Sequence, residues 1–183
     1  TLIEVVCLAH DIGNPPLGHF GETAIKCFFT RLFDEMKEDL DKFREIKDLK
    51  TISHPIILSE LSRYADQENK HKAIASIEEF LTTSNLRLDY TEFDGNAEGF
   101  RVLTKLQFLN DLHGLNLTSA SLASFLKYPN TGESKKSNNK DEDQLSQHKH
   151  GVFETEKTVM QKVMDACDIT RIDDNSYHRH PIS

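Results

Sequence analysis

The sequence has no tryptophan and only three cysteines, Cys7, Cys27 and Cys167. These cysteines are odd in number and lack C-x-x-C spacing, which argues against a disulfide framework or a zinc knuckle and favours a reducing compartment. No apolar run approaches the roughly 20 residues that cross a bilayer, and no basic-then-apolar leader opens the chain. We therefore expect a cytoplasmic protein that does not enter a membrane.

Positive charge is also in short supply. Lysine and arginine together number 22 against 30 acidic residues, so the formal net charge is -8. This balance disfavours a generally basic nucleic-acid binder, and it leaves nucleic acid an uncertain partner. Any site for an anion must therefore be a local cluster of basic residues.

The 183 residues have the length of one domain, and apolar residues recur mostly at helical spacing. The pattern predicts an all-α bundle with long connections, the architecture in which facing helices build metal and ligand sites. One short exception is expected at 85–93, where Leu86, Leu88 and Tyr90 alternate as in an extended segment. Thr118 and Thr155 are predicted as helix caps. The polar stretch 131–150 is predicted to be a mobile loop, because it buries too little apolar area to offset its ordering entropy.

The first candidate site lies near the start of the chain. His10 and Asp11 offer an imidazole and a carboxylate at the end of a helix, which the prolines of 12–16 must terminate. His19 begins the next helix, with Glu22 three positions on and on the same face. A carboxylate bonded to one ring nitrogen would orient His19 for proton transfer. The alternative is that Glu22 serves only as a cap of the helix start.

The stretch around these residues resembles the deoxyguanosine triphosphate triphosphohydrolases of the HD-domain superfamily. It reads Leu8-Ala9-His10-Asp11-Ile12-Gly13-Asn14-Pro15-Pro16-Leu17-Gly18-His19-Phe20-Gly21-Glu22. Shorter stretches resemble the same family in the same order: 93–103, 114–118, Lys127-Tyr128-Pro129 and 149–153. The resemblance covers nearly the whole chain apart from 40–87 and the polar loop. It implies that residues 1–183 are a partial HD domain, truncated at both ends.

The resemblance also implies a reaction and its residues. Enzymes of this family hydrolyse a deoxynucleoside triphosphate to the deoxynucleoside and tripolyphosphate with a divalent ion, Mg²⁺ or Mn²⁺, and a homo-oligomer is possible. In that scheme His10 and Asp11 are metal ligands, and His19 and Glu22 are catalytic. The matching substrate-binding positions are Asn96, Lys127, Tyr128 and Lys149.

The family's metal site has four protein ligands, and this chain supplies two of them. An earlier histidine is expected upstream of Thr1 and a later aspartate beyond Ser183. Asp173 and Asp174 precede His180-Pro181, the segment that matches the family's His-Pro, and are expected to be decoys. We therefore expect weak metal binding and poor turnover by these 183 residues alone. Two other functions stay open: an HD phosphohydrolase acting on another nucleotide, and a catalytically silent regulatory subunit.

Overall fold

The computed structural model describes residues 1–106, 113–133 and 149–183. It confirms the predicted all-α class, with one small hairpin in addition. The longer helices are α1 (Leu2–Ala9), α2 (His19–Ile46), α3 (Pro55–Leu61), α4 (Gln67–Thr82), α6 (Gly95–Arg101), α7 (Ser119–Phe125) and α8 (Lys157–Asp165). The short elements are η1 (Leu49–Thr51), η2 (Asn85–Arg87), α5 (Leu88–Thr91), the π-helical η3 (Val102–Leu106), η6 (Glu154–Glu156), β1 (Arg171–Asp173) and β2 (Ser176–Tyr177). Every helix of these ranges is too short or too polar to span a bilayer.

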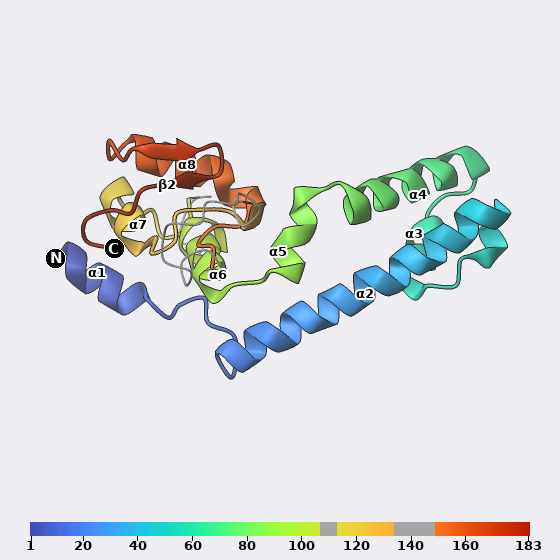
Figure 1. Cartoon of the computed structure of the whole chain (residues 1–183), viewed down its shortest axis with the longest axis horizontal. Helices are drawn as coiled ribbons and strands as arrows, with labels where there is room; N and C mark the ends of the chain where they lie inside the picture. Colours follow the sequence, from blue (N-terminus) through green and yellow to red (C-terminus); the bar gives the residue numbers. More distant parts are fainter. Residues whose placement is uncertain (107–112, 134–148) are drawn as a thin grey trace.

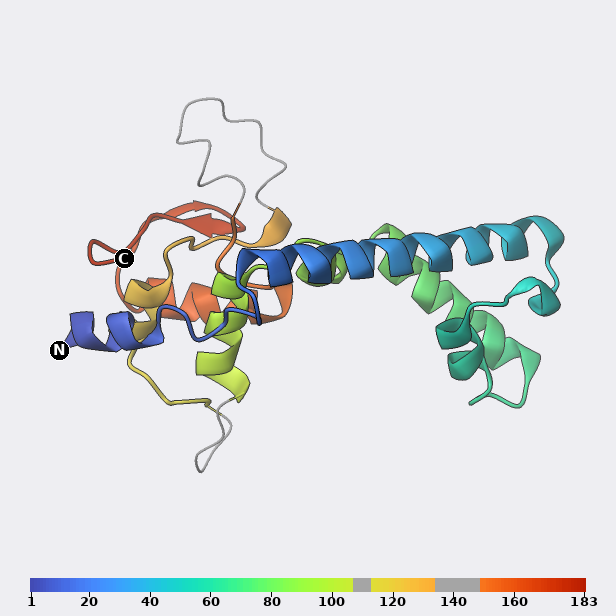
Figure 2. The same cartoon turned by 90° about the horizontal axis from the view of Figure 1, so that it is seen from below.

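The helices form a globular part and a projecting arm (Figure 1). The globular part contains α1, α6, α7, α8 and the hairpin, around a core that includes the fully buried Phe100 and Met160. The arm consists of α2 with α3 and α4, which project away from the globular part in both views (Figure 2). A second core, with Phe33, Ile57 and Leu81, holds the arm together. The first turn of α2 therefore belongs to the globular part, and the remainder of the helix carries the arm.

Residues 85–91 are helical, so the extended segment predicted at 85–93 is wrong. The Ser84 side chain caps η2 by accepting a hydrogen bond from the Leu86 amide (3.2 Å), and α5 follows without a break. Tyr90 then packs against Phe29 of α2, with ring centroids 5.0 Å apart. Asp89 instead accepts from the Glu154 amide (2.7 Å). The consecutive residues Asp89 and Tyr90 contact different elements, and these tertiary contacts favour the helix. Three alternating apolar residues are by themselves only a weak indication of a strand.

The predicted cap Thr155 is also wrong. Residue Glu156 precedes α8, and no side chain caps that helix start. The Thr155 hydroxyl donates to the Glu156 carboxylate (2.8 Å) and accepts from Arg101 (2.8 Å). By contrast, Thr118 caps α7 as predicted, through the amide of Ser121. The Thr155 hydroxyl takes part in a buried network of ion pairs, which the sequence pattern around the helix start does not reveal.

That network ties α5, α6 and η6 together. Glu156 is 1% exposed and pairs with Arg101 (3.0 Å) and Lys105 (2.7 Å). Asp89 lies 3.7 Å from Arg101 and accepts from the backbone amide of Glu154. Burial raises the pKa of the Asp89 carboxyl above its ordinary value of 3.8, although its backbone hydrogen bonds and Arg101 oppose the shift. Burial likewise raises the pKa of Glu98.

The raised pKa of Asp89 makes a testable difference to stability. A carboxyl with a raised folded-state pKa binds its proton more tightly in the folded than in the unfolded chain. Its stabilising contribution is therefore complete below the unfolded pKa and is lost as the pH rises through the folded pKa. We expect Asp89→Asn to gain stability relative to the unsubstituted chain between about pH 4 and pH 7, measured by urea unfolding. A difference that stays constant over this range would contradict the shift.

Candidate active site

The predicted site residues meet at one cavity of about 380 Å³. It lies where the end of α1, the following loop, the first turn of α2 and the first turn of α6 come together with the segment after α7. All of the predicted residues except Tyr128 line it: His10, Asp11, His19, Glu22, Asn96, Lys127 and Lys149. These positions are spread over most of the chain, so the fold brings together what the sequence separates.

His10 and Asp11 form a close, exposed pair at the end of α1. His10 Nδ1 lies 2.7 Å from the carbonyl oxygen of Cys7, and because a carbonyl only accepts, Nδ1 carries a proton and donates it. The other ring nitrogen, Nε2, lies 2.8 Å from Asp11 Oδ2. The second oxygen of Asp11 accepts from the side-chain amide of Asn14 (2.7 Å). Backbone and amide contacts thus hold the imidazole and the carboxylate, whose nearest atoms lie 2.8 Å apart, in fixed positions at the edge of the cavity.

This donor set fits a divalent ion. Neighbouring ligand atoms around a small divalent cation lie about 3 Å apart, since each is roughly 2.1 Å from the ion. The 2.8 Å separation of His10 Nε2 and Asp11 Oδ2 agrees with that spacing. Within the described ranges, no group of three or more His, Cys, Asp or Glu side chains could hold a metal. Mg²⁺ is often held by one or two protein ligands together with water and substrate phosphates, so a two-ligand arrangement is chemically reasonable.

The decoy assignment of Asp173 and Asp174 agrees with their positions. Asp173 accepts from the Asn175 amide (2.7 Å) in the hairpin turn. Asp174 pairs with Arg171 (2.8 Å), and neither aspartate lines the cavity. Both carboxylates stabilise the turn between β1 and β2.

Glycines set the distance between the His-Asp loop and α6. A Cβ atom on Gly13 would lie 2.0 Å from the Gly99 nitrogen and 2.1 Å from the Gly95 oxygen. Both neighbours are helix backbone, which cannot move aside as a flexible side chain can. The loop therefore packs directly against the backbone of α6, with room at Gly13 for hydrogen atoms but not for a side chain. This contact brings the end of α1 and the start of α6 to one cavity.

Glu22 is buried and has a partner that the sequence did not suggest. Its Oε1 accepts from the backbone amide of Gly95 (2.9 Å), at the first turn of α6. Among the described residues no hydrogen bond joins Glu22 to the His19 ring. The carboxylate satisfies an amide that has no partner inside its own helix, and its charge suits the positive end of the helix dipole. Its predicted role in orienting His19 stays a prediction.

His19 contacts Lys149 instead. The Lys149 ammonium lies 3.3 Å from His19 Nε2 and donates to it, because an ammonium has no lone pair to accept with. The Thr23 hydroxyl donates to the carbonyl oxygen of His19 (2.9 Å) and steadies the first turn of α2. The contact places Lys149, which is predicted to bind the phosphates of the substrate, next to His19, which is predicted to transfer a proton.

The remaining predicted residues divide into two kinds. Asn96 lines the cavity on α6, and its side-chain amide donates to Asp94 (2.7 Å). Lys127 also lines the cavity, and its ammonium lies 5.4 Å from the ring centroid of Tyr128. Tyr128 is half-buried and does not line the cavity. The lining of the cavity therefore gives no support to the predicted direct contact between Tyr128 and the substrate.

Several lining residues were not predicted as site residues. Among them, Arg179 and Ser124 belong to no recognised motif or periodic face. Ser124 is 1% exposed, and its hydroxyl is hydrogen-bonded to the His180 ring (3.0 Å). The available signal was that Arg179 directly precedes the His180-Pro181 segment. The predicted loop at 131–150 falls mostly on 134–148, outside the described residues, while Thr131 and His150 at its ends are buried.

Comparison with known proteins gives consistent results. A protein of Pseudomonas aeruginosa named deoxyguanosinetriphosphate triphosphohydrolase-like is 29% identical over 182 residues, covering 100% of this chain and 31% of that protein. A like-named protein of Listeria monocytogenes is 34% identical over 96% of this chain and 28% of its own length. The deoxyguanosinetriphosphate triphosphohydrolase of Cronobacter sakazakii is 34% identical over 70% of this chain and 21% of its own length.

No protein-family model matches the chain. The chain spans at most about 31% of the length of these relatives, and the similarity to the first of them covers it completely. The similarity thus includes the His-Asp loop, the start of α2 and the segment that carries Lys127 and Tyr128. The chain is a homologue of the deoxyguanosinetriphosphate triphosphohydrolases and their like-named relatives.

Proposed function

We propose that the protein hydrolyses a deoxynucleoside triphosphate such as dGTP, with a divalent metal ion, to the deoxynucleoside and tripolyphosphate. One observation carries the proposal. The predicted metal pair, the predicted proton-transfer histidine and two lysines line the same cavity. Hydrolysis of a phosphate ester needs charge neutralisation, a positioned water and a proton acceptor or donor in one place. The names of the relatives agree with this reaction class.

The lysines supply the affinity for the substrate. Lys127 and Lys149 offer ammonium donors to a polyanion, and the Asn96 amide adds a neutral donor on the facing helix. The acidic groups of the cavity already have partners: Asp11 contacts His10 and Asn14, and Glu22 accepts from Gly95. Their repulsion of a phosphate is reduced by these contacts. A net acidic chain thus offers a locally cationic cavity.

Lys149 also links substrate binding to the proton chemistry. In the present arrangement its ammonium donates to His19 Nε2, so the lone pair of that nitrogen is engaged. A triphosphate that draws the ammonium toward its own oxygens would release Nε2. His19 would then take a proton from the attacking water or, once protonated, give one to the leaving 5′ oxygen.

His10 and Asp11 would hold the ion. When bound there, a divalent ion supplies positive charge that polarises the phosphate and lowers the pKa of a water molecule. The hydrogen bond from His10 Nδ1 to Cys7 fixes the ring tautomer, and Asn14 orients the carboxylate. These contacts hold both ligand atoms ready without help from the metal.

Product analysis tests the reaction. The chain is incubated with dGTP and excess Mn²⁺, and the products are separated by anion-exchange chromatography. We expect deoxyguanosine and tripolyphosphate, and we expect EDTA to abolish their release. Release of orthophosphate or pyrophosphate would instead indicate a phosphohydrolase of another specificity. Absence of any product from a chain that is shown to bind both Mn²⁺ and the nucleotide would favour a silent regulatory subunit.

Asp11→Asn tests the metal ligand separately. The amide keeps the shape and the bond to Asn14 but removes the charge that a divalent ion requires. We expect Mn²⁺ affinity to fall by about tenfold or more, measured by electron paramagnetic resonance titration, and any dGTP hydrolysis to fall by about a hundredfold. Asp173→Asn is the matched control and should change neither. Equal Mn²⁺ binding by the Asp11→Asn variant and the unsubstituted chain would remove Asp11 from the metal site.

A further inference from the structure

Two cations lie over one aromatic ring beside the cavity. The Lys127 ammonium and the Arg179 guanidinium are each 5.4 Å from the ring centroid of Tyr128. The negative face of an aromatic ring attracts a cation at this distance. Two like charges beside one ring repel each other, however. An anion that binds between or beside them would offset this repulsion and stabilise the arrangement. Both cations line the cavity, where that anion would lie.

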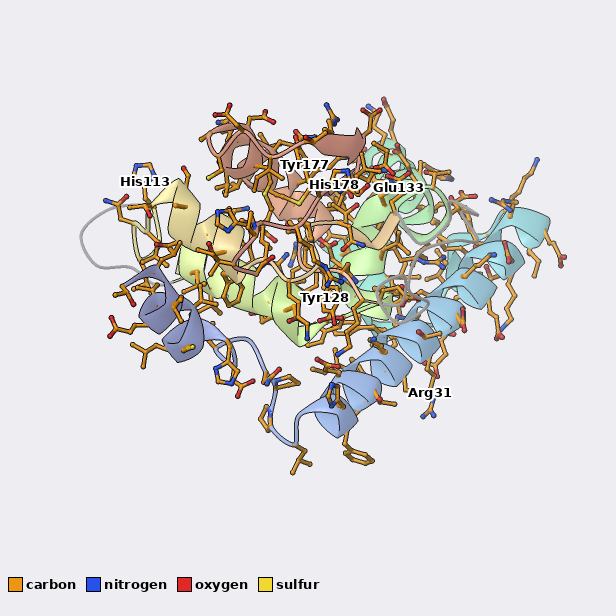
Figure 3. The ribbon with its side chains drawn as sticks, turned by 60° about the vertical axis from the view of Figure 1, so that its left-hand side comes forward. Arg31, His113, Tyr128, Glu133, Tyr177 and His178 are labelled. Atoms are coloured by element: carbon orange, nitrogen blue, oxygen red, sulfur yellow. The ribbon has the colours of Figure 1, made fainter. Side chains whose placement is uncertain are left out.

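The backbone around Arg179 is fixed on both sides. Tyr177 donates its amide to the Pro129 carbonyl (3.0 Å), one residue after Tyr128. On the other side, the His180 ring is hydrogen-bonded to the buried hydroxyl of Ser124 (3.0 Å). Figure 3 shows Tyr128, Tyr177 and His178 together in the globular part. The position of Arg179 at the cavity is therefore imposed by the fold and does not depend on the arginine side chain itself.

Arg179 has no acidic partner among the described residues, unlike most arginines of this chain. Arg44, Arg63, Arg101 and Arg171 each pair with a carboxylate. In the part of the chain that the structure describes, no carboxylate lies within ion-pair distance of Arg179, and its guanidinium lies over the Tyr128 ring. An unpaired guanidinium at a cavity in a chain of net charge -8 is available to an external anion.

We infer that Arg179 binds the polyphosphate of the substrate and that Tyr128 is a positioning residue, which holds Arg179 and Lys127 through its ring. This inference rests on the proposed function and adds a third cation to the two lysines. A guanidinium suits the task because its planar fork can donate two parallel hydrogen bonds to phosphate oxygens. The ring of Tyr128 matters in this scheme, and its hydroxyl does not.

The test is the affinity of the full chain for inorganic tripolyphosphate, measured by isothermal titration calorimetry with EDTA present, so that metal binding and catalysis do not enter. We expect Arg179→Ala to raise the Kd by about tenfold and Arg179→Lys by less, because lysine keeps the charge without the fork. Tyr128→Phe should keep the affinity, whereas Tyr128→Leu should weaken it by about fivefold. Arg31→Ala is the matched control, since this exposed arginine projects from α2 away from the globular part (Figure 3). Circular dichroism confirms that each variant is folded.

The outcomes separate this inference from the proposed reaction. Unchanged tripolyphosphate binding by Arg179→Ala, in a chain that releases tripolyphosphate from dGTP, would overturn the inference and leave the proposed function standing. Weakened binding by Arg179→Ala in a chain that does not hydrolyse dGTP would support the inference and count against the reaction. A loss of affinity in Tyr128→Phe would overturn the positioning role of the ring. Failure of the unsubstituted chain to bind tripolyphosphate would overturn the polyphosphate site and Arg179 with it.

Discussion

Glu156→Gln is expected to lower the free energy of unfolding by about 3 kcal/mol, the cost of removing one partner from a buried ion pair. Glu156 is 1% exposed, whereas the side chains of Arg101 and Lys105 that contact it are 26% and 42% exposed. The substitution leaves both cations without their nearest counter-charge in a partly desolvated place. For a chain of this size the midpoint of thermal unfolding should fall by roughly 10 °C. Calorimetry or circular dichroism would measure it.

Glu154→Gln is the control for this experiment. Glu154 is on the same short helix, and its ion pair with Lys157 (3.3 Å) joins two residues only three positions apart. Pairs of this kind contribute less than about 1 kcal/mol. If the two variants were equally stable, the Glu156 network would contribute no more than a surface ion pair does, and its role in joining α5, α6 and η6 would have to be abandoned.

Gly13→Ala should have an effect of similar size on stability and a larger one on the site. The new methyl group would meet backbone atoms of α6 at 2.0 and 2.1 Å, far inside van der Waals contact. Since a helix backbone does not yield, the loop must lift away from α6, at a cost of about 3 kcal/mol. His10 and Asp11 would move with it, away from Asn96 and Lys127. We therefore expect loss of both Mn²⁺ binding and dGTP hydrolysis.

Gly132→Ala provides the comparison, because a methyl group there meets nothing closer than 3.4 Å, an ordinary contact. Both glycines are buried, so the two variants differ mainly in the space available. Urea unfolding and Mn²⁺ titration should distinguish them clearly. A Gly13→Ala variant with unaltered stability and metal affinity would show that the close contact with α6 is not needed to form the site.

The features that depended on neighbouring residues were predictable from the sequence. The helix before the prolines of 12–16 ends where expected, and Thr118 caps α7, because backbone restriction and capping act over a few residues. The all-α class followed from apolar spacing in the same way. The resemblance, carried above all by the motif from Leu8 to Glu22, also named seven of the residues that line the cavity, but not Arg179 or Ser124.

Only the tertiary structure decided which partners those residues have. Glu22 bonds to an amide 73 positions away instead of the nearby His19, and Arg179 meets Tyr128 across more than 50 residues. The segment 85–91 is helical because Tyr90 and Asp89 find partners on different elements. Periodicity describes which face of an element is buried, but it contains no information about what that face meets. The sequence by itself therefore determined the chemistry available to the site, and the packing of α2, α6 and the segment after α8 determined how that chemistry is arranged.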